Sequence, residues 1–247
     1  MITLARIELR KLTTTPALYV SAGIVALFTV LSVAAGILLA GQQGTPPLGS
    51  EPNVTKTLSI AALSSMVMLV LGILATAGEF RQRTIMWTFL AEPRRGRVLA
   101  AKLAVLGAVG AAMGALAFGL ALAIAVPWYA AKGIHVLPVS VPSLWAGATV
   151  AGTCYGLLGV ALGALTRNTI AAVLGGLAWV QIIEVGVLQH FVPALAKWLP
   201  TGAAVAITTP GQTHGLLPWG LATLVLTGWA LALALIATRV SLRRELR

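Results

Sequence analysis

Residues 58–78 decide the fold, because they read LSIAALSSMVMLVLGILATAG without a single charged side chain. As a helix that rises about 1.5 Å per residue, this run is long enough to cross a hydrocarbon core of roughly 30 Å. It is followed at 79–97 by EFRQRTIMWTFLAEPRRGR, whose charges must stay in water, and then by a second apolar run that begins at Val98. We therefore predict two membrane spans joined by a charged loop.

The rest of the chain follows the same pattern. It is 58% hydrophobic and 9% charged, a composition typical of membrane proteins. The apolar runs are continuous rather than alternating, which favours helices over the strands of a barrel. We predict an all-α integral membrane protein that forms a single transmembrane domain over residues 1–247. Its six spans are predicted at 17–40, 58–78, 98–126, 143–165, 169–189 and 216–238.

The basic residues indicate how the spans are oriented. Fourteen of the 17 lysines and arginines fall near the termini or in the loops after the second and fourth spans, and only Lys56, Lys132 and Lys197 fall on the other side. Because basic residues are retained on the cytoplasmic side, we expect both termini to be cytoplasmic. The abundance of Arg, Ala and Gly favours a bacterial inner membrane. Segment 17–40 is too long for a signal peptide and is expected to remain as an anchor.

Three segments outside the spans differ in character. Residues 2–12 carry an apolar and a basic helical stripe, the pattern of a short helix in the inner membrane interface, with a solvated basic leader as the alternative. The loop 41–57 contains three prolines and three glycines and is predicted to be irregular. Residues 190–215 contain short apolar pieces broken by Pro and Gly, which predict a re-entrant or interfacial outer hairpin. The apolar stripe is Ile2, Ala5, Leu9 and Leu12, and the basic stripe is Arg6, Arg10 and Lys11.

Small residues recur on one face of the fourth span. Gly152, Gly156, Gly159 and Gly163 follow Ala148 at spacings of three or four residues. Such a smooth face lets another helix approach closely, and close packing is what holds helices together in lipid. We assign these glycines to helix packing rather than to transport.

Glu184 is the one acidic residue inside a predicted span. It lies about 15 residues, or roughly 22 Å, from the cytoplasmic end of the fifth span, and so in the outer half of the membrane. A carboxylate at mid-helix costs about 2.5 to 3.5 kcal/mol to insert, so Glu184 is expected in the protein interior or in a wet cavity. Gln181 is one helical turn away on the same predicted face. The pair either makes structural hydrogen bonds at a helix interface or marks a translocation pathway.

The charged loop and its flanks carry a family resemblance. Gly78-Glu79-Phe80-Arg81, Thr84-Ile85, Thr88-Phe89-Leu90, Pro93 to Arg97 and Ala101-Lys102 resemble the conserved loop of bacterial type 2 ATP-binding-cassette (ABC-2) exporter permeases. The order of an interfacial helix, six spans and an outer hairpin is similar as well. The resemblance implies a permease subunit that works as a homodimer or heterodimer on a pair of separate cytosolic ATPase subunits.

In such permeases the first cytoplasmic loop forms a coupling helix seated in a groove of the ATPase, which implies a coupling helix between the second and third spans here. Aromatic and leucine side chains would fill the groove, arginines would pair with acids, and a proline would end the helix. A loop whose arginines only fix the topology is the alternative, but it leaves the aromatics unexplained. The family's translocation path is lined partly by the second and fifth spans, which implies that Gln181 and Glu184 lie near it. The implied coupling residues are Glu79, Phe80, Arg81, Arg83, Thr84, Trp87, Leu90, Pro93, Arg94 and Arg95.

The chain has no Gly-rich segment that ends in Gly-Lys-Ser or Gly-Lys-Thr, so it is not expected to be an enzyme, and ATP and Mg²⁺ are expected only in the partner ATPase. The three histidines lack metal-ligand spacing and Cys154 has no partner, so we predict no metal site or cofactor. Nucleic acid is not an expected partner. The sparsely charged spans favour export of an amphipathic or lipid-like compound, drug or peptide. The alternative function is a proton-coupled secondary transporter that uses Glu184, although no repeat between the two halves supports it.

Overall fold

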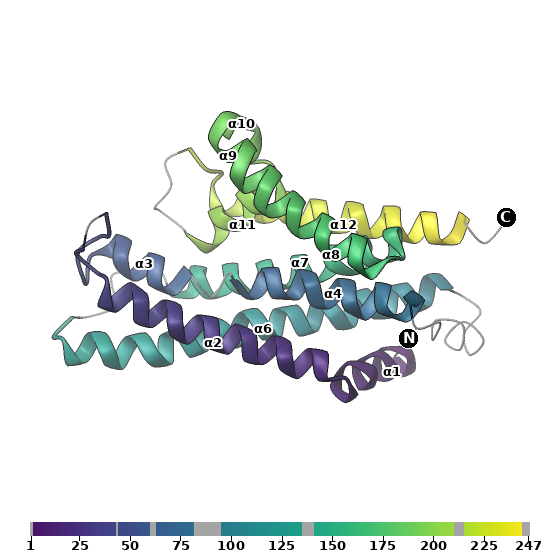
Figure 1. Cartoon of the computed structure of the whole chain (residues 1–247), viewed down its shortest axis with the longest axis horizontal. Helices are drawn as coiled ribbons and strands as arrows, with labels where there is room; N and C mark the ends of the chain where they lie inside the picture. The colour runs from purple at the N-terminus through teal and green to yellow at the C-terminus, as the bar shows by residue number, and fades with distance from the viewer. Residues whose placement is uncertain are drawn as a thin grey trace.

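Every regular element of the described residues is a helix, and the longest helices run side by side along the molecule (Figure 1). The computed structural model describes residues 2–42, 44–59, 63–81, 95–134, 141–209 and 215–243. In chain order the helices are α1 (Ile2–Thr14), α2 (Pro16–Leu38), α3 (Glu51–Ser59), α4 (Leu63–Arg81), α6 (Arg95–Ala131), α7 (Val141–Thr166), α8 (Thr169–Ala178), η2 (Trp179–Leu188), α9 (Gln189–Phe191), α10 (Pro193–Ala196), α11 (Pro200–Thr208) and α12 (Trp219–Arg243).

Six segments are long and apolar enough to cross a membrane, and the second of them combines α3 and α4 across residues 60–62, which lie outside the described part of the chain. This confirms the predicted all-α architecture and the number of spans. Five segments begin and end within five residues of the predicted bounds, and the second begins seven residues earlier than predicted. The six segments are Pro16–Leu38, Glu51–Arg81, Gly96–Ala131, Val141–Thr166, Thr169–Phe191 and Trp219–Ser241.

The prediction of an irregular loop over 41–57 is wrong in its second half, where Glu51–Ser59 form α3. Contacts with distant helices hold α3 in place. The Asn53 amide donates to the Gly36 carbonyl oxygen of α2 at 3.0 Å, and the Tyr129 hydroxyl of α6 donates to the Asn53 side-chain oxygen at 2.6 Å. Because these partners are far away in the sequence, the local run of prolines and glycines did not reveal the helix.

Helix α7 is the central helix of the bundle and packs along both α4 and α6. A Cβ on Gly152 would lie 2.3 Å from the Gly110 carbonyl oxygen of α6, and one on Gly159 would lie 2.2 Å from the Leu69 carbonyl oxygen of α4. Only glycine fits at contacts this close, so a larger side chain would push the helices apart. The other two predicted packing glycines are placed similarly, Gly156 against Leu106 of α6 and Gly163 against Thr76 of α4.

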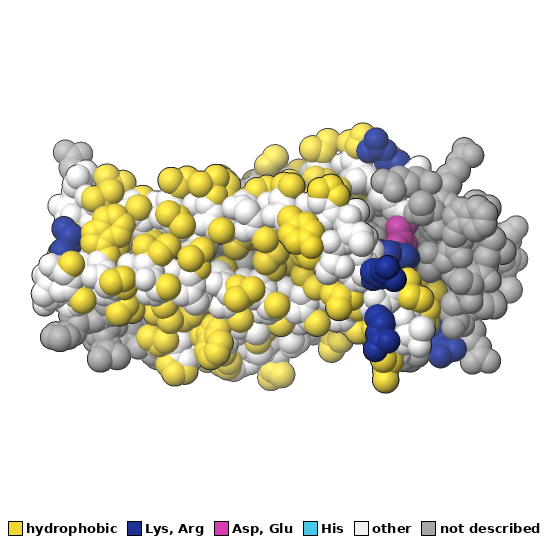
Figure 2. All heavy atoms as spheres, turned by 90° about the horizontal axis from the view of Figure 1, so that it is seen from below, with side chains coloured by type: hydrophobic (Ala, Val, Ile, Leu, Met, Phe, Trp, Pro, Cys, Tyr) yellow, Lys and Arg dark blue, Asp and Glu magenta, His cyan; other side chains and the backbone are white. Residues whose placement is uncertain are grey.

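The outer helices present apolar side chains away from the bundle. In the most apolar stretch of α7, 67% of the residues are buried, whereas the share is 28% or less in α2, in α12 and in the span made by α8 and η2. Figure 2 shows hydrophobic side chains over the middle of one face, with lysine and arginine side chains gathered mainly toward the end where α1 lies. An apolar belt between charged ends is what a bilayer requires of a multi-pass membrane protein.

The chain turns back on itself after η2. Helices α9 and α10 are about one turn each, and α11 returns to the bundle, where it packs against α7 and α12 (Figure 1). Seven of the nine residues of α11 are buried. The apolar pieces of the predicted hairpin at 190–215 are therefore short helices, and the last of them is part of the protein core.

Candidate functional site

Helix α1 packs against α2 and α6 and buries Glu8 and Leu12. Of the predicted apolar stripe, Leu12 enters the bundle, while Ile2 and Leu9 remain exposed. The buried face of α1 thus includes a carboxylate that neither predicted stripe contained.

Glu8 belongs to a network that, among the described residues, contains four charged side chains from three helices. Lys102 of α6 donates to Glu8 Oε2 at 2.6 Å, to Glu79 Oε1 of α4 at 3.1 Å and to the Ala75 carbonyl oxygen at 3.1 Å. Lys11 donates to Glu8 Oε1 at 2.7 Å and to Glu79 Oε1 at 3.1 Å. The side chains of Lys102 and Glu8 are each only 4% exposed. Among the residues that the structure describes, two carboxylates face two ammonium groups in this ion network.

The electrostatics of the network favour its charged form. Burial raises the pKa of Glu8, but the charge of Lys102 and the hydrogen bonds from Lys102 and Lys11 outweigh that effect, and the pKa lies below its ordinary value. Burial lowers the pKa of Lys11, but its hydrogen bond to Glu8 and the charges of Glu79 and Glu8 outweigh it, and that pKa is raised. Both groups are therefore ionised at neutral pH.

The predicted coupling residues are only partly described. The Glu79 carboxylate contacts Lys102 and Lys11, so it connects α4 with α6 and α1. Phe80 lies under the Arg167 guanidinium, 5.1 Å from the ring centroid, a cation–π contact between α4 and the loop after α7. Arg81 is exposed and Arg95 begins α6. Arg83, Thr84, Trp87, Leu90, Pro93 and Arg94, the predicted coupling helix and the side chain of Arg95 lie outside the described residues.

Sequence reasoning missed the role of Glu8 and used Lys102 only for the topology and for the family resemblance. One signal was available: Glu8 precedes Lys11 by three residues in an otherwise basic segment, a spacing that allows an ion pair on a helix. The pairing of Glu8 with Lys102, 94 residues away, has no local signature.

The fifth span changes its helical geometry part-way. Residues Trp179–Leu188 form η2, a π-helix, in which each backbone hydrogen bond spans five residues instead of four. Glu184 is 1% exposed, as predicted, but Gln181 is exposed. The prediction that the two side chains share one face is wrong, because it assumed α-helical spacing.

The Glu184 carboxylate accepts two hydrogen bonds from neutral donors. The Trp179 indole N–H donates to Oε1 at 2.6 Å, and the Thr201 backbone N–H donates to Oε2 at 2.8 Å. Thr201 lies in the first turn of α11, so Glu184 caps that helix and interacts favourably with the positive end of its dipole. Among the residues that the structure describes, no lysine or arginine forms an ion pair with Glu184.

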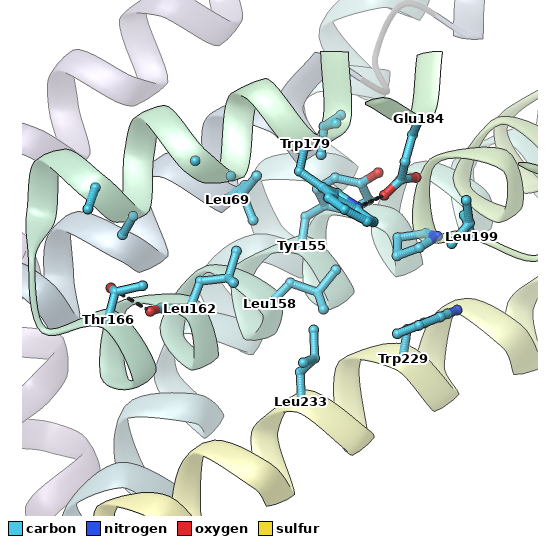
Figure 3. A pocket seen from close by; sticks show the side chains of 16 residues that line it. Leu69, Tyr155, Leu158, Leu162, Thr166, Trp179, Glu184, Leu199, Trp229 and Leu233 are labelled. Carbon is cyan, nitrogen blue, oxygen red and sulfur yellow. Dashed lines mark hydrogen bonds between the residues drawn. The ribbon is translucent and has the colours of Figure 1, made fainter. Parts of the chain in front are cut away.

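Glu184 also borders an apolar cavity of about 400 Å³. Leu69 of α4 and several residues of α7 form one wall, and α8 with η2 and α12 form the others (Figure 3). Trp179 stands on the η2 side beside the carboxylate, and Trp229 and Leu233 face the cavity from α12. The α7 side chains in the lining are Tyr155, Leu158, Leu162 and Thr166.

No protein-family model matches this sequence, and no curated protein is significantly similar to it.

Proposed function

We propose that this chain is the membrane-spanning permease subunit of an ATP-driven exporter of the ABC-2 type. The observation that carries the proposal is the position of the ion network. Residues 82–94, which resemble the ATPase-contacting loop of that family, join α4 to α6. Glu79 lies just before this loop and Lys102 two helical turns into α6, and both bind α1 through Glu8 and Lys11. A partner that displaces the loop therefore moves three helices together.

The network is suited to transmit force, because separating its members would leave buried charges without partners. Such a loss costs on the order of 3 to 5 kcal/mol. Helices α4 and α6 in turn contact α7 through close backbone approaches at Gly159 and Gly152. When two ATPase subunits close on ATP, the loop would carry this block of helices with it, and the transporter would change between inward-open and outward-open states.

The proposal places the loop and both termini in the cytoplasm and the chain in the inner membrane of a bacterium. Its support is the gathering of basic side chains toward the end that bears α1 (Figure 2), together with the tendency of basic residues to stay cytoplasmic. In this orientation α1 lies in the inner interface with Ile2 and Leu9 toward the lipid. The α9 to α11 segment then forms the outer hairpin.

The functional unit that we propose contains two permease subunits, identical or related, and two cytosolic ATPase subunits that supply ATP and Mg²⁺. The permease pair moves an amphipathic or lipid-like compound, drug or peptide out of the cytoplasm. The translocation path runs between the permeases, beside the second and fifth spans.

The test is stimulation of ATP hydrolysis. The chain is purified from its native membrane, a co-purifying ATPase is identified by mass spectrometry, and hydrolysis is measured with both proteins in vesicles. Replacing Trp87 with alanine is expected to lower the stimulated rate at least tenfold without preventing insertion. Trp145→Ala is the matched control, because Trp145 is 53% exposed at the start of α7, at the opposite end of the bundle. Transport that needs no ATPase and follows a proton gradient would overturn the proposal in favour of the secondary transporter.

A further inference from the structure

We infer that the cavity between η2 and α12 binds lipophilic cations, compounds that carry one positive charge on a large apolar or aromatic body. This inference deepens the proposed function, on which it rests, by naming the class of cargo. It is carried by the size of the cavity, its single charged group, and the orientation of its aromatic rings.

The cavity has the dimensions and lining of a small-molecule site. Its volume of about 400 Å³ falls in the range of roughly 300 to 1,000 Å³ that is usual for such sites. Leucine side chains cover much of its wall, among them Leu69, Leu158 and Leu233. An aromatic or aliphatic body that enters it exchanges a watery or interfacial environment for an apolar one, which favours binding.

Glu184 is the only charged residue among those described in the lining. An ionised carboxylate offers about four acceptor positions, and the bonds from Trp179 and Thr201 occupy two of them. Both donors are neutral, so the end of α11 offsets the negative charge only in part. A cation in the cavity would pair with this charge in a medium of low dielectric constant, where the attraction is strong, and an anion of the same shape would be repelled.

The two tryptophans that line the cavity have their N–H groups bound within the protein. The Trp179 N–H is bound to Glu184 and the Trp229 N–H is bound to the Trp198 carbonyl oxygen at 2.9 Å. As whole residues, Trp179 is 51% exposed and Trp229 is 39% exposed. Figure 3 shows them on different sides of the cavity. Aromatic faces are negative and attract cations, so the tryptophans and Glu184 favour the same sign of charge.

Gly175 of α8 is a position at which the cavity can be filled by mutation. It lines the cavity, and a Cβ built on it meets no atom within 4 Å. A larger side chain there therefore meets no backbone clash.

The test measures binding of tritiated tetraphenylphosphonium to the purified full chain in lipid nanodiscs, without any ATPase. Binding of tetraphenylborate, which has the same shape and the opposite charge, is measured in a separate sample. The dissociation constant for the phosphonium is expected to be at least tenfold lower than that for the borate. Gly175→Leu is expected to weaken phosphonium binding at least tenfold. Gly228→Leu is the matched control with unchanged binding, because Gly228 of α12 also has open space around it but does not line the cavity.

Glu184→Gln is expected to remove the preference for the cation. If that variant does not fold, the comparison of the two ions and the Gly175→Leu variant still decide the question. Equal binding of both ions would overturn the inference and indicate a site for neutral lipid tails, and unchanged phosphonium binding by Gly175→Leu would overturn it as well. Because no ATPase is present, these failures leave the exporter proposal intact, whereas a failed Trp87→Ala test leaves the binding site intact.

Discussion

Among the described residues two acids are buried, Glu8 and Glu184, and they have different kinds of partners. Glu8 is 3% exposed and lies between the ammonium groups of Lys102 and Lys11. Glu184 is 1% exposed and, among the described residues, accepts hydrogen bonds only from neutral N–H groups. Lysine partners already neutralise the charge of Glu8, so this acid holds helices together, whereas an acid bound by neutral donors still attracts a cation. We therefore call the ion network of Glu8, Lys11, Glu79 and Lys102 the joint, and we regard the surroundings of Glu184 as a binding site.

The two acids also connect helices over different distances in the sequence. The ion network joins α1, α4 and α6, with Glu8 and Lys102 separated by 94 residues. Glu184 joins η2 to α11 across 17 residues. The ion network connects α1, α4 and α6, whereas Glu184 borders a cavity. We therefore expect α1, α4 and α6 to move as one body, and the region of η2 and α12 to admit another molecule.

Lys102→Met is expected to have the largest effect, because it removes one of the ammonium groups of the joint. The variant removes the buried ammonium group that contacts both Glu8 and Glu79, and removing one partner of a buried ion pair costs about 3 to 5 kcal/mol. We expect a large fall in the melting temperature of the purified chain in detergent, measured by intrinsic fluorescence.

Lys132→Met is the control for this substitution, because Lys132 is exposed just after α6 and surface changes usually stay within about 0.5 kcal/mol. Adding Glu8→Gln and Glu79→Gln to Lys102→Met should restore part of the loss, since fewer buried charges then lack a partner. If Lys102→Met and Lys132→Met have the same melting temperature, the network does not hold the helices together. The difference in role between Glu8 and Glu184 would then be contradicted.

Glu184→Gln is expected to have a smaller effect on stability. Glutamine offers one acceptor oxygen and turns an NH₂ group toward the second donor, so one of the N–H groups of Trp179 and Thr201 loses its bond. An unsatisfied buried donor costs about 1 to 3 kcal/mol. Gln181→Ala, on the same helix but exposed, should leave the melting temperature unchanged. A loss as large as that of Lys102→Met would mean that Glu184 has an ionic partner, which contradicts its assignment as a site.

The spans and the burial of Glu184 were predictable, because each depends on the local cost of placing a residue in lipid. A run such as Pro16–Leu38 is apolar enough to identify a span without knowledge of its neighbours. The burial of Glu184 follows from the same cost applied to one carboxylate.

The remaining features depend on pairings that no local pattern encodes. Helix α3 is held by the hydrogen bonds that join Asn53 to Gly36 and Tyr129. Glu8 and Lys102 form an ion pair although they are 94 residues apart in the sequence. The π-helical geometry of η2 separates Gln181 from Glu184, and it coincides with the bond from Glu184 to the start of α11. The cavity is a property of how α8, η2 and α12 pack, so its residues could not be selected from the sequence.

The smallest expected effect is a dependence on pH of the stability that the joint contributes. The pKa of Glu8 is lowered from its ordinary value of 4.5, so its contribution to stability is fully present above that value and is lost as the pH falls through the lower pKa of the folded protein. The pKa of Lys11 is raised from 10.5, so its contribution is present below that value and is lost as the pH rises through the raised pKa.

The measurement is the difference in melting temperature between the wild type and Glu8→Gln. It should stay constant across the neutral range, because both groups remain ionised there, and it should shrink only under acid conditions below the ordinary pKa of a glutamate. The difference in melting temperature between the wild type and Lys11→Met should disappear only at alkaline pH. A difference for Glu8→Gln that changes near neutral pH would show that Glu8 titrates there, which is incompatible with a carboxylate held between two lysines.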